Sequence, residues 1–364
     1  MTTSADNTTD DFGAWFTEDQ PRSLTVKSLQ CFSLVLVFIL TFVGNGSIAW
    51  TLYKNFSIKN VPNMLLFSLT MVNFSIAVLS VPFAIVSTAT DEWIFGNAWC
   101  KLSGFLNQFL TFTSNTIATV VALYRYQAIA KTFSAQITLR GAKWITAFAC
   151  FYSLVFSLPP LFGWNTYRFS RKKGFCTLHW EDGGPGMVYT VLVVLACFLI
   201  PLAMIVFMYV RITVITRHNA KNLRTQPASF SSPRSSAQTR TDVSDDVSSD
   251  VTTRNKSTRI RRFSKRYLSS SRDSISESKT MTSVSYVMAT YVLFLAPYYV
   301  MNISSALSQD PLSPAVDFAS SWLYYCHATV VAVVYGYLNR RIRPVLKQLP
   351  WWPKCPGCRK EQEG

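Results

Sequence analysis

The sequence has few of the residues that catalysis and ion coupling require. It contains only three histidines, and it has neither the His-Glu-x-x-His nor the Gly-x-Ser-x-Gly pattern of common hydrolases. Aspartate and glutamate are nearly absent from its long apolar segments, so no buried carboxylate pair is available. No internal repeat, polar pore or selectivity filter is recognisable. These absences argue against an enzyme, an ion-coupled transporter and a channel, and we expect no cofactor and no metal site.

Long apolar segments are what the sequence does contain. Most of them reach about 20 residues, which is the length of a helix that crosses a bilayer. Because hydrocarbon offers no hydrogen-bond partners, each segment is predicted to be helical. The seven segments are Ser33–Tyr53, Met64–Val86, Leu102–Leu123, Trp144–Phe162, Met187–Val210, Val284–Val300 and Phe318–Tyr337. We therefore predict an all-α membrane protein that forms a seven-transmembrane helix bundle.

The charges between these segments are sorted by side. The formal net charge is +16, and most basic residues fall on alternate loops and on the C-terminal tail. The positive-inside rule makes these loops cytoplasmic, and it explains the charge better than nucleic-acid binding does. The acidic N-terminal stretch then lies outside, in a multi-pass protein of the plasma membrane. The loop Arg168–Lys173 is an exception, because it is basic on the outer side. It could attract an acidic ligand or contact the acidic N-terminus, although most charged loops are only solvated.

The expected domain order follows from these segments. An extracellular N-terminus (1–28) precedes transmembrane helices one to five (29–216). The third cytoplasmic loop (217–276) is rich in Ser, Thr, Arg and Asp and is predicted to be disordered. Helices six and seven (277–337) are followed by an amphipathic membrane-surface helix (338–349) and a cytoplasmic tail (350–364).

Several positions are candidates for covalent modification. Asn7 heads a glycosylation sequon in the N-terminus. Cys100 and Cys176 both fall on the oxidising outer side, where a disulfide is favoured. Cys355 and Cys358 follow the basic amphipathic stretch, which favours palmitoylation over metal binding or plain free thiols.

A further modification site lies in the third cytoplasmic loop. The run Arg261-Arg262-Phe263-Ser264 fits a basophilic kinase substrate, with Ser264 as the acceptor. Phosphate there would add roughly two negative charges to a basic segment. Any loop rich in arginine and serine offers such matches, so the pattern has low specificity.

A set of residues along these segments resembles the rhodopsin-like (class A) G-protein-coupled receptors. The resemblance runs from Cys31 to Leu349, and its strength lies in the joint order and spacing of its parts. The matching positions are Gly44-Asn45, Trp93–Cys100, Arg125-Tyr126, Pro201, Tyr209, Pro297 and Tyr335. A looser likeness, to an orphan amine-like receptor associated with primary cilia, rests on Ser68–Asn73, Glu92–Gly96 and Leu158–Trp164.

The resemblance implies a function and a set of partners. Such receptors are two-state bundles in which a ligand shifts the population and a cytoplasmic cleft opens. The implied partners are a heterotrimeric G protein, arrestin and receptor kinases inside, the lipid bilayer around, and an unknown ligand outside. Proline kinks at Pro201 and Pro297 would assist the motion. The ciliary membrane is an alternative to the general plasma membrane.

The resemblance also implies an activation switch centred on Arg125. The family normally pairs this arginine with the acidic residue just before it, but that position is Tyr124 here. Its second usual partner is retained as Glu277, so we expect an Arg125–Glu277 pair that breaks on activation. The alternative is an arginine that snorkels to the membrane surface and a glutamate that is only solvated.

Other family positions are altered in this chain. Asn73 replaces the acidic residue that helps to hold sodium, so weak or absent sodium binding is expected. Leu295 replaces a tryptophan, and Val331-Ala332 replaces an Asn-Pro pair. Two readings follow: high basal activity from a looser inactive state, or an impaired receptor that serves as a partner or trafficking factor. Tyr209 and Tyr335 are both present, which favours a working receptor.

The resemblance places a ligand pocket in the outer half of the bundle. It would be aromatic with a few neutral polar groups, a normal composition for a small-molecule site, although bundle packing explains the aromatic residues as well. Amine receptors carry an aspartate at Asn107, so a simple monoamine is disfavoured, and opsins need a lysine at Tyr325, so retinal is disfavoured. The predicted residues are Asn107, Gln108, Thr111, Val193, Cys197, Tyr298, Tyr299, Asn302, Ser321, Trp322 and Tyr325.

Overall fold

The computed structural model describes most of the predicted membrane segments. The described residues are 22–56, 60–130, 137–179, 184–225, 289–308, 313–338, 342–346 and 348. Five predicted sites lie outside them, and these are Asn7, Ser264, Glu277, Cys355 and Cys358. The side chains of Arg125 and Tyr335 are also outside the description, although their backbones are helical.

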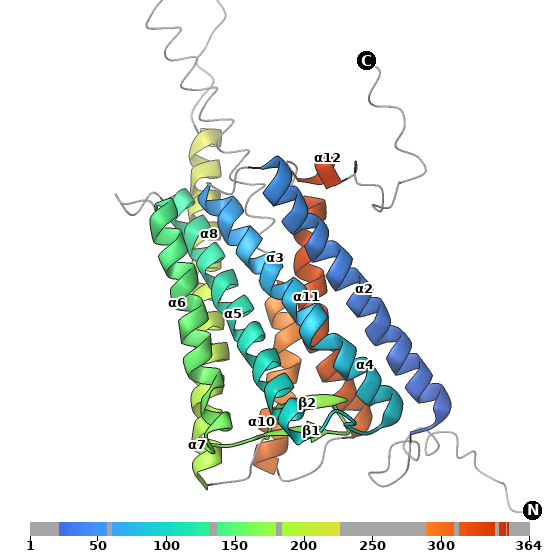
Figure 1. Cartoon of the computed structure of the whole chain (residues 1–364). Coiled ribbons are helices and arrows are strands. Elements are labelled where there is room, and N and C mark those ends of the chain that lie inside the picture. Colours follow the sequence, from blue (N-terminus) through green and yellow to red (C-terminus); the bar gives the residue numbers. More distant parts are fainter. Residues whose placement is uncertain are drawn as a thin grey trace, which may run out of the picture. The chain divides into compact units, whose positions relative to one another are not determined.

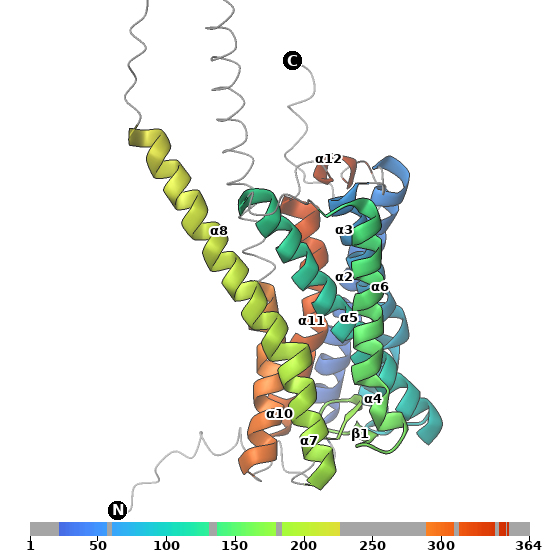
Figure 2. The ribbon, with the colours of Figure 1, turned by 90° about the vertical axis from the view of Figure 1, so that its left-hand side faces the viewer.

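The chain divides into two compact units. The first comprises Met1–Tyr209 with Ser283–Gly364, and the second comprises Val210–Thr282, of which the structure describes the end of one helix. The first unit is a bundle of long helices, joined at one end by a small β-hairpin (Figures 1 and 2). The helices are α2 (Leu24–Asn55), α3 (Val61–Leu79), α4 (Val81–Thr90), α5 (Asn97–Ala130), α6 (Leu139–Ser157), α7 (Gly184–Val193), α8 (Ile200–Thr225), α10 (Ala296–Ser308), α11 (Pro314–Leu338) and α12 (Arg343–Leu346).

The apolar segments form helices because of their length and their caps. Ser23 begins α2, where its hydroxyl accepts a hydrogen bond from the backbone N–H of Val26 at 3.4 Å. Thr138 begins α6 in the same way, by accepting from Gly141 at 3.2 Å. Among the described residues, four helical stretches are long and apolar enough to cross a membrane, and they are Leu24–Asn55, Val61–Thr90, Leu139–Leu161 and Gly184–Ile215.

The interior of the bundle combines a hydrophobic core with buried polar side chains, and the outside is apolar. Helix α5 carries Asn107 and Asn115, and both side chains are buried. Large apolar side chains face outward instead, as for Phe151 and Phe207, which are 62% and 59% exposed. Soluble domains rarely expose such continuous apolar surface, whereas hydrocarbon accepts it without cost. The distribution therefore suits a bundle surrounded by lipid.

Prolines interrupt three of the predicted spans. The second span divides at Ser80 into α3 and α4, with Pro82 in the first turn of α4. Wide π-helical turns, Val194–Leu199 and Tyr291–Leu295, come just before Pro201 and Pro297. A proline removes one backbone hydrogen bond, and a π turn is one way in which a helix absorbs the irregularity. An irregular turn therefore precedes both Pro201 and Pro297.

A two-stranded antiparallel hairpin covers one end of the bundle. Its strands are β1 (Tyr167–Ser170) and β2 (Phe175–Leu178), and Tyr167 pairs with Leu178. The strands contact α5, and β2 also contacts α4 (Figure 1). Tyr167 packs so closely on α5 that a Cβ atom at Gly104 would lie 2.8 Å from the tyrosine ring. The absence of a side chain at Gly104 therefore allows the hairpin to pack closely on α5.

The described helix ends differ from some expected boundaries. Helix α8 continues to Thr225, past the boundary expected at residue 216. The predicted membrane-surface helix 338–349 is not confirmed, because α12 is one short turn and much of that range lies outside the description. Ile342 and Leu346 are buried beside Ile48 and Leu52 of α2, so this turn does pack on the bundle.

Candidate functional site

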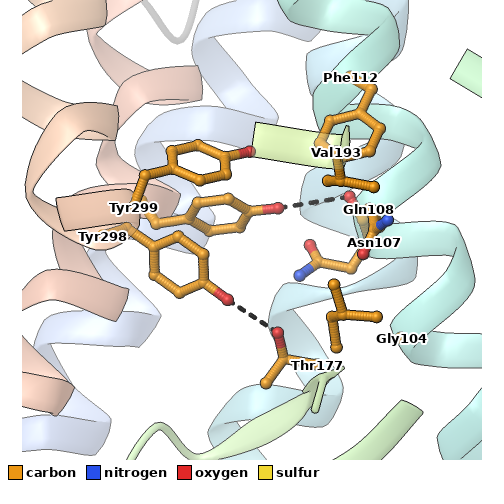
Figure 3. A pocket seen from close by; sticks show the side chains of 10 residues that line it. Gly104, Asn107, Gln108, Phe112, Thr177, Val193, Tyr298 and Tyr299 are labelled. Carbon is orange, nitrogen blue, oxygen red and sulfur yellow. Dashed lines mark hydrogen bonds between the residues drawn. The ribbon is translucent and has the colours of Figure 1, made fainter. Parts of the chain in front are cut away.

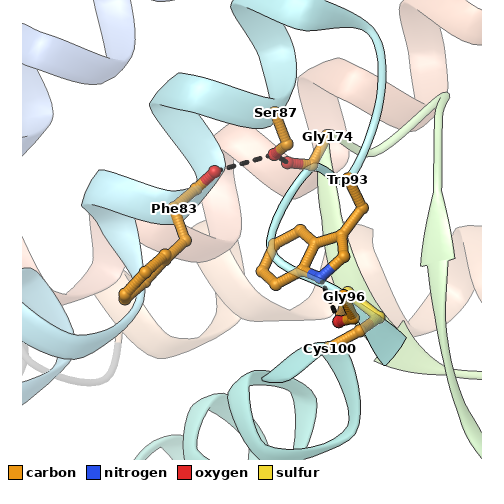
Figure 4. The surroundings of a disulfide bond; sticks show 7 residues. Phe83, Ser87, Trp93, Gly96, Cys100 and Gly174 are labelled. Atoms are coloured by element: carbon orange, nitrogen blue, oxygen red, sulfur yellow. Dashed lines mark hydrogen bonds between the residues drawn. A yellow bond between two sulfur atoms is a disulfide. The ribbon is translucent and has the colours of Figure 1, made fainter. Parts of the chain in front are cut away.

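A disulfide attaches the hairpin to the bundle. Cys100, in the first turn of α5, is joined to Cys176 of β2, as the sequence predicted (Figure 4). The turn of the hairpin is also held, because the Ser87 hydroxyl of α4 donates to the backbone oxygen of Gly174. Gly174 has φ +77°, and a side chain there would overlap with Thr88. The disulfide and this hydrogen bond are therefore two of the contacts that attach the hairpin to the helices.

The predicted ligand pocket has a cavity of only about 20 Å³. Side chains from α5, β2, α7, α10 and α11 line this deep cavity (Figure 3). They are Gly104, Asn107, Gln108, Phe112, Thr177, Leu178, Val193, Tyr298, Tyr299 and Tyr324. A single water occupies about 10–15 Å³ by the same measure, so the cavity holds roughly one water.

The hairpin packs its side chains against this cavity and against the aromatic rings beside it. Phe175 of β2 is 3% exposed and lies among the aromatic rings of α11. Its ring centroid is 6.2 Å from that of Tyr324, in a stacked arrangement, and 5.2 Å from that of Tyr325, edge to face. Thr177, two residues further on, shares a 2.7 Å hydrogen bond with the hydroxyl of Tyr298 (Figure 3). The chain thus fills its own deep site with its own side chains.

Hydrogen bonds inside the bundle occupy several polar groups of this site. The Tyr324 hydroxyl donates to Thr111 Oγ1 at 2.6 Å. Gln108 donates from Nε2 to the hydroxyl of Tyr189 at 3.3 Å. Asn107 differs, because its buried Oδ1 has no partner among the described residues. Trp322 Nε1 and the Tyr325 hydroxyl are likewise buried without a partner in the described part of the chain, so these three groups remain for a deep ligand.

The predicted pocket residues divide into three groups in the structure. Five of them line the deep cavity, and these are Asn107, Gln108, Val193, Tyr298 and Tyr299. Five are packed around it or toward the hairpin end of α11, and these are Thr111, Cys197, Ser321, Trp322 and Tyr325. Asn302 lines a second cavity nearer the end of the bundle. Sequence reasoning missed Tyr324, although its neighbour Tyr325 was chosen and the same helix carries both.

This second cavity, the outer cavity, has a volume of about 170 Å³ and lies between the hairpin, α10 and α11. Lys173, in the hairpin turn, donates from Nζ to Oδ1 of Asn302. The same ammonium lies 5.6 Å from the ring centroid of Tyr298, within the range of a cation–π contact. Burial lowers the pKa of Lys173 to about 8, and nearby Asp317 opposes that shift.

Other basic residues of the hairpin end form a separate charge cluster. Asp91 ends α4 and is nearly buried, and its carboxylate lies 3.5 Å from Nε of Arg22 and also pairs with Lys27. Arg171 donates from Nε to the backbone oxygen of Asp91 at 3.2 Å. The cluster joins the start of α2 to the end of α4 and to the hairpin turn. Arg171, which belongs to the basic loop Arg168–Lys173, therefore has a structural role.

The predicted switch residues are only partly described. Asn73 is buried, and its Oδ1 accepts a hydrogen bond from the Ser114 hydroxyl at 2.7 Å. Tyr124, Tyr209 and Pro297 are half-buried on α5, α8 and α10. These contacts place Asn73 in the polar interior of the bundle, and the pairing expected for Arg125 remains a prediction.

Comparisons with known proteins point to one family. The sequence profile described as "7 transmembrane receptor (rhodopsin family)" matches residues 44–335. The chain is 27% identical over 324 residues to G-protein coupled receptor 161 of Xenopus tropicalis, covering 88% of this chain and 60% of that protein. It is 26% identical over 356 residues to 5-hydroxytryptamine receptor 1E of Homo sapiens, covering 91% and 94%. The chain thus spans less than two thirds of the length of the first of these relatives.

A solved structure agrees with the observed architecture. The crystal structure of squid rhodopsin matches with a TM-score of 0.75 at 17% identity, covering 92% of this chain and 87% of that one. At this identity the likeness establishes the fold alone. The match confirms the seven-helix fold class, and the family consists of receptors and not enzymes. The chain therefore belongs to the rhodopsin family of seven-transmembrane receptors and is a multi-pass membrane protein.

Proposed function

We propose that this chain is a receptor that passes a signal to heterotrimeric G proteins and does so in part without a bound ligand. The proposal rests on the rhodopsin-family match across residues 44–335, together with the disulfide-linked helix bundle. The small volume of the deep cavity supports signalling without a bound ligand. Tyr298, Tyr299 and Tyr324 line this cavity, and Phe175 packs against Tyr324, so little space is left for a deep ligand.

The chemistry of the deep site disfavours two ligand classes. Asn107 carries no charge to pair with the ammonium of a simple monoamine, even though one relative is named for 5-hydroxytryptamine. Tyr325 cannot form the Schiff base that retinal requires. A ligand of either class would also have to displace Phe175 from a buried aromatic cluster. The signal that reaches this receptor is therefore expected to act nearer the hairpin.

The orientation and the cellular partners follow from the charge pattern. With the acidic N-terminus outside, the hairpin end of the bundle faces the exterior of the plasma membrane, or of the ciliary membrane. Glycosylation at Asn7 and palmitoylation at Cys355 and Cys358 suit that orientation. Phosphorylation at Ser264 would lie on the same side as the G protein, where receptor kinases and arrestin act.

The activation switch is proposed to be an Arg125–Glu277 pair that holds the inactive state. Glu277→Ala should raise basal cyclic AMP or calcium signalling several-fold, because loss of about 1 kcal/mol from one state shifts a two-state population by roughly fivefold. Arg125→Ala should reduce the same signal to background. Basal reporter assays at matched surface expression test both changes, and an unchanged signal in Glu277→Ala cells would remove the pair from the account.

A signalling-impaired partner protein is the second candidate function. Leu295 is fully buried where the family carries a tryptophan, so the usual relay through this position is altered. Under this alternative the chain would carry another receptor to its membrane and would itself be silent. Silence of both the wild-type chain and Glu277→Ala in every pathway would favour it.

A further inference from the structure

Two opposite charges face the outer cavity without pairing with each other. Lys173 and Asp317 both line it. Both residues belong to the described part of the chain, and no ion pair within 4.0 Å joins them, unlike those that Arg22 and Lys27 form with Asp91. Lys173 and Asp317 therefore lie too far apart for a direct contact. Lys173 is half-buried and Asp317 is nearly buried, and they attract each other without direct contact, which leaves room for a closer partner between them.

The ammonium of Lys173 is held in place by its surroundings. Asn302 is 2% exposed, and its Nδ2 donates to the backbone oxygen of Tyr298 at 2.6 Å, which orients Oδ1 toward Lys173. The face of the Tyr298 ring supports the same ammonium. One of the three N–H groups of Lys173 is accounted for by Asn302. The others remain available to an acceptor in the cavity.

Asp317 supplies the opposite charge on α11. Its side chain is almost buried, with 8% of the residue exposed. Its backbone oxygen accepts hydrogen bonds from the hydroxyls of Ser320 and Ser321, at 2.9 and 2.8 Å. Its carboxylate has no hydrogen bond within the described part of the chain. This carboxylate would repel a simple anion, and Lys173 would repel a simple cation.

We propose that the outer cavity binds a small amphoteric molecule, whose carboxylate pairs with Lys173 and whose ammonium pairs with Asp317. Arg168, at the exposed edge of the cavity, would add a second positive charge near the carboxylate. A volume of about 170 Å³, against 10–15 Å³ for one water, admits a ligand of roughly ten non-hydrogen atoms. The bound molecule would act as a signal only if the chain is the receptor proposed above, so this part of the proposal rests on that function.

Thermal unfolding of the purified full chain in lipid nanodiscs tests the site directly. The probes are 4-aminobutanoate, 5-aminopentanoate and L-leucine, compared with butanoate and butylamine, which each carry one of the two charges. At least one amphoteric probe should raise the unfolding temperature in a saturable way, with an apparent affinity at least tenfold above that of either singly charged probe. No shift with any amphoteric probe, or an equal shift with butanoate, would overturn the proposal.

Substitutions make the test specific to the two charges. Lys173→Met should weaken the amphoteric probe at least tenfold, and Lys101→Met, at an exposed lysine outside the cavity, should leave it unchanged. Asp317→Asn should shift selectivity toward butanoate, a gain that a merely damaged protein cannot show. Retention of the wild-type preference in Asp317→Asn would count against the pairing. If a variant fails to fold, the wild-type comparison of probes still decides.

The unfolding experiments include no G protein, so a negative result for probe binding can be told apart from a failure of the proposed G-protein coupling. A probe that binds without changing nucleotide exchange would support the site and count against its signalling role. Basal nucleotide exchange without any probe binding would support the receptor function and would contradict the proposed binding site.

Discussion

Replacing Cys176 by serine should remove most of the folded receptor from the cell surface. The disulfide joins residues 76 positions apart, and removal of a native disulfide costs about 2–5 kcal/mol in small domains. Here the same bond also holds β2 on the end of α5, so its loss releases Phe175 and Thr177 from the deep site. Antibody labelling of intact cells, beside total expression, measures the expected fall.

Cys31→Ser is the matched control for this prediction. Cys31 is a free, half-buried thiol on α2, and its loss should leave surface labelling within the range of the wild-type chain. Cys100→Ser should reproduce the loss seen with Cys176→Ser, and the double variant should be no worse than either single one. Normal surface labelling and normal unfolding temperature in Cys176→Ser would show that the hairpin needs no covalent attachment.

Replacing Phe175 by alanine should destabilise the receptor by about 3–5 kcal/mol, the range for truncation of a buried phenylalanine. The ring is almost fully buried between Tyr324 and Tyr325, so its removal leaves a cavity in the aromatic cluster. Because this ring packs against Tyr324, which lines the deep cavity, the substitution should also change basal signalling at equal surface expression. Thermal unfolding and a basal reporter assay measure the two effects separately.

Phe162→Ala provides the control, since Phe162 lies on the same connection and is 83% exposed. Its removal should change neither the unfolding temperature nor the basal signal. An unfolding temperature that falls equally in both variants would mean that Phe175 contributes nothing through its buried position. An unchanged basal signal in Phe175→Ala would separate the hairpin from the activity of the receptor.

The helices of the bundle were predictable because hydrocarbon imposes one solution on a long apolar segment. The run Leu102–Leu123 lies inside α5, and the pairing of Cys100 with Cys176 followed from placing both on one side of a membrane. The extra length of α2 and α8 was not predictable, because helices continue beyond the hydrocarbon layer where polar residues are tolerated. The π turns before Pro201 and Pro297 depend on packing, which a proline alone does not specify.

The hairpin and its effect on the site could not be predicted from the sequence. Strands β1 and β2 have four residues each, and three of the four β2 residues are buried, so the alternation that marks a strand is absent. Phe175 lies outside the seven apolar segments, and only the fold brings it against Tyr324. Lys173 and Asp317 meet at one cavity for the same reason, because Asp317 lies just before the predicted seventh segment.

Coupling to G proteins without a ligand can be measured as the rate of nucleotide exchange on purified heterotrimeric G proteins, with the purified receptor in lipid nanodiscs and no added ligand. The wild-type chain should accelerate exchange on at least one class of G protein, and Arg125→Ala should not. Equal exchange with the wild-type chain, with Arg125→Ala and with empty nanodiscs, across all classes of G protein, would contradict this coupling.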